Sequence, residues 1–95
     1  MKRTLWYTSI RGKIELQMTE EQAKSASHQG PCDEDVMELS KVPEIAEQLT
    51  KIDPVVLRSE LREYGVWDTE ELTDHDQNLQ RLLWIAASDI GEELL

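Results

Sequence analysis

The sequence is poor in the residues that mark cross-linked, membrane-spanning or nucleotide-binding proteins. It has one cysteine, Cys32, so no disulfide can form within the chain, and a reducing compartment such as the cytoplasm is expected. No apolar run is long enough to span a membrane, and polar residues interrupt the short run Leu5-Trp6-Tyr7 near the start. The four glycines are scattered, which argues against a glycine-rich phosphate loop.

Basic residues are also scarce. Ten Lys and Arg stand against twenty Asp and Glu, so the formal net charge is -10. Such a charge repels a nucleic acid backbone or an anionic membrane at long range, and it attracts proteins with basic surfaces. From residue 54 onward only Arg58, Arg62 and Arg81 oppose the acidic residues. We therefore expect the C-terminal helices to carry most of the negative field.

Hydrophobic residues make up 39% of the 95 residues, enough for one modest core, and we expect a single domain over residues 1–95. The runs Thr4–Ile10 and Lys13–Met18 flank Arg11-Gly12 and predict a β-hairpin over residues 4–18. If Ile10 faces Lys13, alternation along the strands places one set of side chains on the core face. These residues are Leu5, Tyr7, Ser9, Ile14, Leu16 and Met18. Trp6 then lies on the opposite, more polar face.

Residues 19–95 carry a series of helix start signals. Thr19 has capping-box spacing to Gln22 and predicts a short helix to about Ser27. Asp33 can cap a second helix through Leu39, and Pro43 starts a third. Asp53-Pro54 predicts a fourth helix that ends at Gly65. Its expected buried side consists of Val55, Val56, Leu57, Leu61 and Tyr64.

Asp68 followed by Glu71 predicts the N-terminus of the longest helix, which reaches Ile90 or beyond. The expected fold is therefore an α+β domain. Its N-terminal two-stranded antiparallel β-hairpin packs on about four to five α-helices, including a long C-terminal helix.

The sequence offers little for catalysis or metal binding. His28 and Cys32 form an isolated pair, too few ligands for a metal site, and His75 between two aspartates is explained as a solvated residue. A thiolate at Cys32 is disfavoured by the acidic residues that follow it. We expect no enzyme activity, no metal and no cofactor, and the alternative is a small enzyme that uses Cys32 and His28.

The segment Leu57–Val66, Leu-Arg-Ser-Glu-Leu-Arg-Glu-Tyr-Gly-Val, resembles the first helix and turn of SAP-type DNA-binding modules. Those modules continue with lysines and a glycine, whereas this chain continues with acidic residues from Asp68 to Asp76. The resemblance implies similar backbone packing. Phosphate binding does not follow from it, because the charge has the wrong sign.

The acidic clusters have two interpretations. Acidic residues at helix starts stabilise helices, and a rigid array of carboxylates can also imitate a phosphate backbone. Trp6 can add an apolar anchor, since tryptophan is enriched at interface hot spots, or the C-terminal residues can cover it. Trp67 is interpreted as a hydrophobic staple onto Leu72, and Trp84 as core. The predicted partner-binding residues are Trp6, Asp33, Glu34, Asp35, Glu38, Glu70, Glu71, Asp74 and Asp76.

In size, charge and layout the chain resembles small acidic proteins of phages and mobile elements, among them anti-CRISPR inhibitors. Its most distinctive strings are Trp6–Gly12 and Gly65–Asp68, and neither is a defined functional motif. The resemblance implies an inhibitor that binds a protein with a basic surface, such as a nucleic-acid-handling complex. Direct binding of nucleic acid or membrane is not expected.

A second class of function stays open. In a structural or oligomerising module, the apolar C-terminal helix with Trp84, Ile85 and Leu94-Leu95 would pack against a second copy of the chain. A homodimer would then form.

Overall fold

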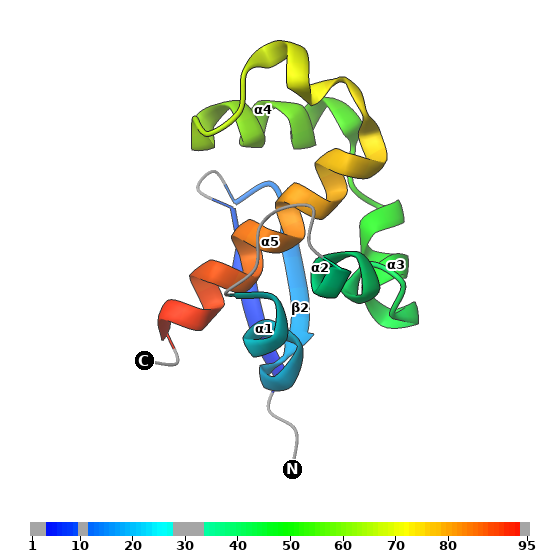
Figure 1. Ribbon diagram of the computed structural model, residues 1–95, viewed down its shortest axis with the longest axis vertical. Coiled ribbons are helices and arrows are strands. Elements are labelled where there is room, and N and C mark those ends of the chain that lie inside the picture. Colours follow the sequence, from blue (N-terminus) through cyan, green and yellow to red (C-terminus); the bar gives the residue numbers. More distant parts are fainter. Residues whose placement is uncertain (1–3, 10–11, 28–33, 94–95) are drawn as a thin grey trace.

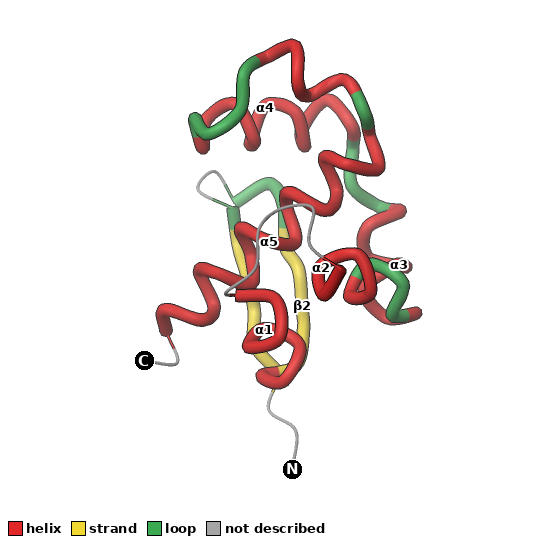
Figure 2. The backbone as a smooth tube through the Cα atoms, viewed as in Figure 1, coloured by secondary structure: helices red, strands yellow, loops and turns green. Residues whose placement is uncertain are grey.

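A computed structural model describes residues 4–9, 12–27 and 34–93 of the chain. In chain order the elements are β1 (Thr4–Thr8), β2 (Glu15–Thr19), α1 (Glu20–Ser27), α2 (Glu34–Leu39), α3 (Pro43–Thr50), α4 (Pro54–Tyr64), the 3-10 helix η1 (Thr69–Thr73) and α5 (His75–Glu93). Figure 2 shows the two strands side by side, with helices next to them. The predicted α+β class, with an N-terminal hairpin and a long C-terminal helix, is confirmed.

The hairpin has the predicted register. Leu5 pairs with Met18 and Tyr7 with Leu16, and these side chains are buried together with Ile14 and Ser9. Both strands are shorter at the turn than predicted, and Ile10 lies outside the described residues. Beyond the strands, the Ser9 N–H still donates to the Ile14 carbonyl at 2.9 Å. The buried Ser9 hydroxyl accepts from the N–H groups of Lys13 and Ile14, at 3.0 and 3.1 Å.

The core lies between the inner face of the hairpin and the helices. Helix α5 crosses β1 and also packs against α1, α2 and α4 (Figure 1). The buried apolar residues form one cluster to which both strands and every helix contribute. Long helices bury an apolar stripe in this way, and Leu82, Leu83, Ala86 and Ile90 of α5 are each at most 1% exposed.

Several predicted helix caps are present. The Thr19 hydroxyl accepts from the Gln22 N–H at 3.2 Å, while the Gln22 side chain accepts from the Thr19 N–H at 2.8 Å, which completes the capping box of α1. The Asp53 carboxylate accepts from the Val55 N–H at 2.8 Å. Gly65 ends α4 with a φ of 79°, a left-handed conformation that glycine adopts without a steric penalty. Asp33, predicted to cap α2, lies outside the described residues.

The predicted single long helix from Asp68 is wrong, because the segment contains two helices. Glu71 accepts from the Asp68 N–H at 3.0 Å as expected, but this cap starts the short helix η1. The chain leaves helical geometry at Asp74, whose carboxylate accepts from the Gln77 N–H at 3.1 Å. A second N-cap six residues after the first therefore starts α5 anew.

The predicted buried side of α4 is partly wrong. Leu57 and Leu61 are fully buried, but Val55 is 75% exposed and Tyr64 is 37% exposed. Glu60 is buried instead, at 7% exposed. It lies three residues after Leu57, on the same helix face, and so turns toward the core with the leucines.

Candidate functional site

Three aromatic side chains meet where α4 ends and η1 begins. Tyr64 and Trp67 stack with ring centroids 6.0 Å apart. Trp84 of α5 meets both rings edge-on, at 6.2 and 6.1 Å. We call Tyr64, Trp67 and Trp84 the aromatic cluster. Such edge-to-face and offset contacts hold aromatic rings in fixed positions.

The aromatic cluster reaches the surface. Trp67 and Trp84 are half-buried, Tyr64 is exposed, and the neighbouring Val66 is 59% exposed. Trp84 is half-buried and packs against the core, as expected, and its ring also completes the surface cluster. The four residues Tyr64–Trp67 carry three large apolar side chains in a turn, a sequence signal that could have placed Tyr64 and Trp67 together but not Trp84.

Arg81 of α5 supports the aromatic cluster from inside. Its guanidinium lies 5.4 Å from the Trp67 ring centroid, within the range of a cation–π contact. The same group donates to the Glu71 carbonyl at 2.7 Å, to Asn78 Oδ1 at 2.9 Å and to Gln77 Oε1 at 3.2 Å. Because Arg81 is only 5% exposed, its charge is buried under the cluster and fixes η1 to α5.

Exposed carboxylates lie on the same chain segment as Tyr64 and Trp67. The segment from residue 63 to residue 80 contains no Lys or Arg. Its acidic residues, all exposed, are Glu63, Asp68, Glu70, Glu71, Asp74 and Asp76. We call these six residues the acidic end, because the connection from α4 to α5 lies at one end of the longest axis of the molecule (Figure 1). Three of them, Asp68, Glu71 and Asp74, take part in helix caps as well.

The structure thus brings four of the predicted partner-binding residues, Glu70, Glu71, Asp74 and Asp76, onto consecutive turns. Asp76 also lines a cavity of about 450 Å³ with His75 and Ser40. Ser40 follows α2, which carries Glu38, another predicted partner-binding residue, and Glu38 is exposed. Asp33 and the side chains of Glu34 and Asp35 lie outside the described part of the chain.

Trp6 lies elsewhere, on the solvent face of β1. It is 58% exposed, so the described part of α5 does not cover it. Ile85, predicted to contact a second copy of the chain, is 4% exposed and belongs to the protein's own core. Leu94 and Leu95 lie outside the described residues.

Tyr7 of β1 lies near three other titratable residues, one of which, Tyr64, belongs to the aromatic cluster. Burial raises the pKa of Tyr7 to about 12, and the nearby charges of Asp89 and Glu60 and the Tyr64 phenol act in the same direction. Oε1 of Glu60 is buried and has no hydrogen-bond partner among the described residues.

The described residues were also searched for a metal site and for a membrane-spanning helix. Within residues 4–9, 12–27 and 34–93, no three His, Cys, Asp or Glu side chains are placed to hold a metal ion together. His28 and Cys32 lie outside the described residues. Among the helices of the described part, none combines the length and apolar character that crossing a membrane requires.

Comparisons with known proteins found no matching family model, no matching curated protein and no matching solved structure.

Proposed function

We propose that the protein acts by binding a partner protein with a basic surface, through the acidic end and the aromatic cluster beside it. One observation carries this proposal. Exposed carboxylates lie next to partly exposed aromatic rings on a connection that two helix caps and Arg81 hold in place.

This combination suits protein recognition for two reasons. Aromatic side chains at the centre of an interface contribute most of the binding free energy, while charged residues at the rim set specificity and the association rate. Groups that are already fixed before binding lose less conformational entropy when the partner arrives. The stacked Tyr64 and Trp67 rings and the capping Glu71 and Asp74 satisfy that condition.

The more specific form of the proposal is inhibition by mimicry of a nucleic acid. A partner that normally holds a phosphate backbone presents Lys and Arg, and the carboxylates of the acidic end would meet those residues. The protein would then act as an inhibitor in the cytoplasm, as its single cysteine suggests. The resemblance to anti-CRISPR inhibitors stays a prediction.

The test is capture of partners from a host lysate by the tagged protein at rising salt, followed by mass spectrometry. We expect a basic nucleic-acid-binding protein that is retained at low salt, released as salt rises and displaced by added DNA or RNA. Retention that is indifferent to salt and to nucleic acid would contradict the proposal. Recovery of the protein's own untagged copies alone would contradict it too and would favour an oligomerising module.

A further inference from the structure

The cavity of about 450 Å³ beside the acidic end lies between α3 and the first turns of α5. Its polar lining residues are Ser40, Thr50, His75, Asp76 and Gln80. With histidine counted as neutral, Asp76 is the one charged residue of this lining, and no Lys or Arg of the described residues contributes to it. The charge of this cavity therefore favours a cation.

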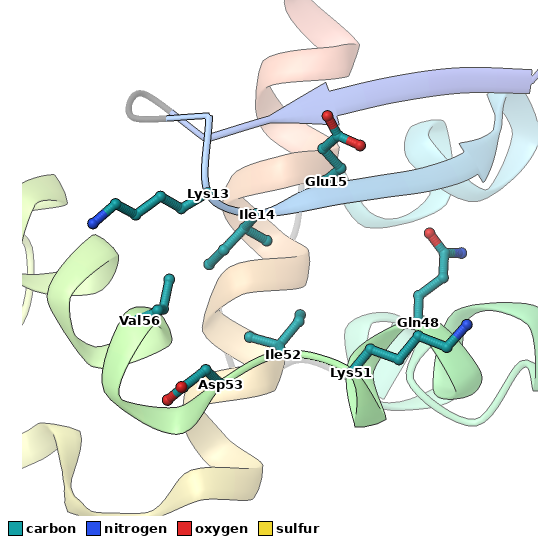
Figure 3. Close-up of a pocket in the computed structure, with 8 residues that line it drawn as sticks. All are labelled: Lys13, Ile14, Glu15, Gln48, Lys51, Ile52, Asp53 and Val56. Carbon is teal, nitrogen blue, oxygen red and sulfur yellow. The ribbon is translucent and has the colours of Figure 1, made fainter.

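The cavity between β2 and the residues that join α3 to α4 differs in charge. Figure 3 shows Lys13, Lys51, Glu15 and Asp53 around it, and all four belong to its lining. Two cations and two carboxylates offset each other, so this cavity selects neither sign of charge. The cavity beside α5, in contrast, presents charge of one sign.

Two hydroxyl groups of the cavity beside α5 offer only acceptors to a ligand. The Ser40 hydroxyl donates to the Met37 carbonyl at 2.5 Å, and the Thr50 hydroxyl donates to the Glu47 carbonyl at 2.7 Å. A hydroxyl group has a single hydrogen, so each of these oxygens keeps only lone pairs for another partner. The cavity therefore favours an occupant that donates hydrogen bonds.

The Asp76 carboxylate is free to pair with such an occupant. It is exposed, and its side chain makes no hydrogen bond or ion pair with another described residue. An anion is not favoured at the same helix start, because the Asp74 carboxylate already accepts from the Gln77 N–H. A cation that meets Asp76 therefore displaces no existing contact of that carboxylate within the described part of the chain.

The cavity also has apolar walls. Leu49 is buried, Ala46 and Leu79 are half-buried, and all three belong to the lining. The arginine side chain has a methylene stem that packs on apolar surface, and its planar guanidinium carries only donors. The lysine ammonium is more compact and has fewer donors, so it reaches fewer acceptors around a cavity. Arginine is thus the side chain that matches both the walls and the polar groups.

We propose that this cavity receives an arginine side chain of the partner protein. The methylene stem lies on Leu49 and Leu79. The guanidinium pairs with the Asp76 carboxylate and donates to the hydroxyl oxygens of Ser40 and Thr50. This inference rests on the proposed function, because it names the residue of the basic partner that the acidic end receives. The recognised group is then arginine, and not positive charge in general.

The probes are three capped pentapeptides, acetyl-Gly-Gly-Xaa-Gly-Gly-amide, in which Xaa is arginine, lysine or citrulline. Citrulline keeps the shape of arginine without its charge. Each peptide is added to the full, isotope-labelled chain at low salt and about pH 7.5, where most of an ordinary imidazole is neutral, and amide chemical shifts are followed by NMR.

We expect the arginine peptide to shift the amide signals of Thr50, Leu79 and Gln80 in a saturable way. Its affinity should exceed that of the lysine peptide about threefold, because the guanidinium reaches more acceptors. The citrulline peptide should bind about fivefold more weakly than the arginine peptide, since it has no charge for Asp76.

Two variants test the named groups. Asp76→Asn keeps the shape of the side chain and removes its charge, so the arginine peptide should bind about fivefold more weakly. The matched control Glu70→Gln removes one exposed charge of the acidic end outside the cavity lining and should change the affinity by less than about twofold. Thr50→Val removes an acceptor at constant shape and should lower the preference for arginine over lysine.

The inference is overturned if no saturable shift occurs at Thr50, Leu79 and Gln80 with the arginine peptide. It is also overturned by equal affinity for the arginine and lysine peptides, or by equal effects of Asp76→Asn and Glu70→Gln. Both of these results would show that the acidic end attracts any cation, which leaves the proposed function standing. A partner from the lysate that is indifferent to salt and nucleic acid would instead reject the proposed function, even where the arginine peptide binds.

Discussion

At the residue scale, Glu60 is the least expected feature of the core. It is 7% exposed, and Oε1 has no hydrogen-bond partner among the described residues. A buried carboxylate oxygen without a partner destabilises a fold, so Glu60→Leu should raise the free energy of unfolding by about 1–2 kcal/mol in urea denaturation. Glu70→Leu, at an exposed carboxylate, is the control and should change it by less than about 0.5 kcal/mol. A destabilised Glu60→Leu variant would show that the carboxylate is satisfied.

Tyr7 links stability to alkaline pH. Its pKa is raised from 10.0 to about 12, first by burial and then by Asp89, Glu60 and Tyr64. Below pH 10 the phenol is neutral in both states. Between about 10 and 12 the unfolded chain loses this proton first, so the free energy of unfolding should fall as pH rises, by up to about 2–3 kcal/mol.

The measurement is urea denaturation at several pH values in that window, with Tyr7→Phe as the comparison. The variant should lack this part of the decline. Equal pH dependence of the two proteins would mean that the Tyr7 pKa is not raised.

Residue-scale properties were the hardest to predict from the sequence. Strand alternation predicted correctly that Leu5, Tyr7 and Leu16 are buried, because a strand has only two faces. The sequence could not predict the complete aromatic cluster, since Trp84 comes from a helix distant in sequence from Tyr64 and Trp67. Whether a tryptophan is core or surface depends on where its helix crosses the others.

At the element scale, the start of α5 depends on Asp74. Its carboxylate accepts from the Gln77 N–H, and substitution of such a cap by Ala costs about 1 kcal/mol. Asp74→Ala should therefore lower the free energy of unfolding by about 1 kcal/mol in urea denaturation. Asp76→Ala, two residues later and without a hydrogen bond to a cap among the described residues, should lower it by clearly less. Equal losses would indicate a general helix-dipole effect in place of the cap.

Element boundaries were largely predictable because caps are local. Thr19 with Gln22, Asp53 with Pro54, and Gly65 each act within one turn of the chain, and each lies where the sequence placed it. The break between η1 and α5 was missed because Asp68 and Asp74 are both good caps. The bond from Asn78 to the Leu72 carbonyl and those of Arg81 then hold the two helices at an angle, and such contacts have no sequence signature.

At the scale of the whole molecule, the acidic residues of the connection from α4 to α5 lie at one end. The segment from residue 63 to residue 80 has no Lys or Arg, in a chain whose net charge is -10. Strand β1 begins far from η1 along the longest axis (Figure 1). The sequence shows the net charge of each segment. Only the fold shows that the acidic end lies at one end of an elongated molecule of 41 × 27 × 26 Å.

The central claim, that the acidic end meets a basic partner, is tested most directly by a matched charge reversal. Glu70→Lys with Asp76→Lys changes two exposed carboxylates of the acidic end, one in the first turn of the 3-10 helix η1 and one in the first turn of α5. Glu44→Lys with Glu47→Lys makes the same change in charge on α3, where Glu44 is in the first turn. Both variants are compared with the natural chain for the amount of partner retained from lysate at low salt. The account predicts that the Glu70 and Asp76 variant loses the partner while the Glu44 and Glu47 variant keeps it, and equal retention by the two variants would contradict it.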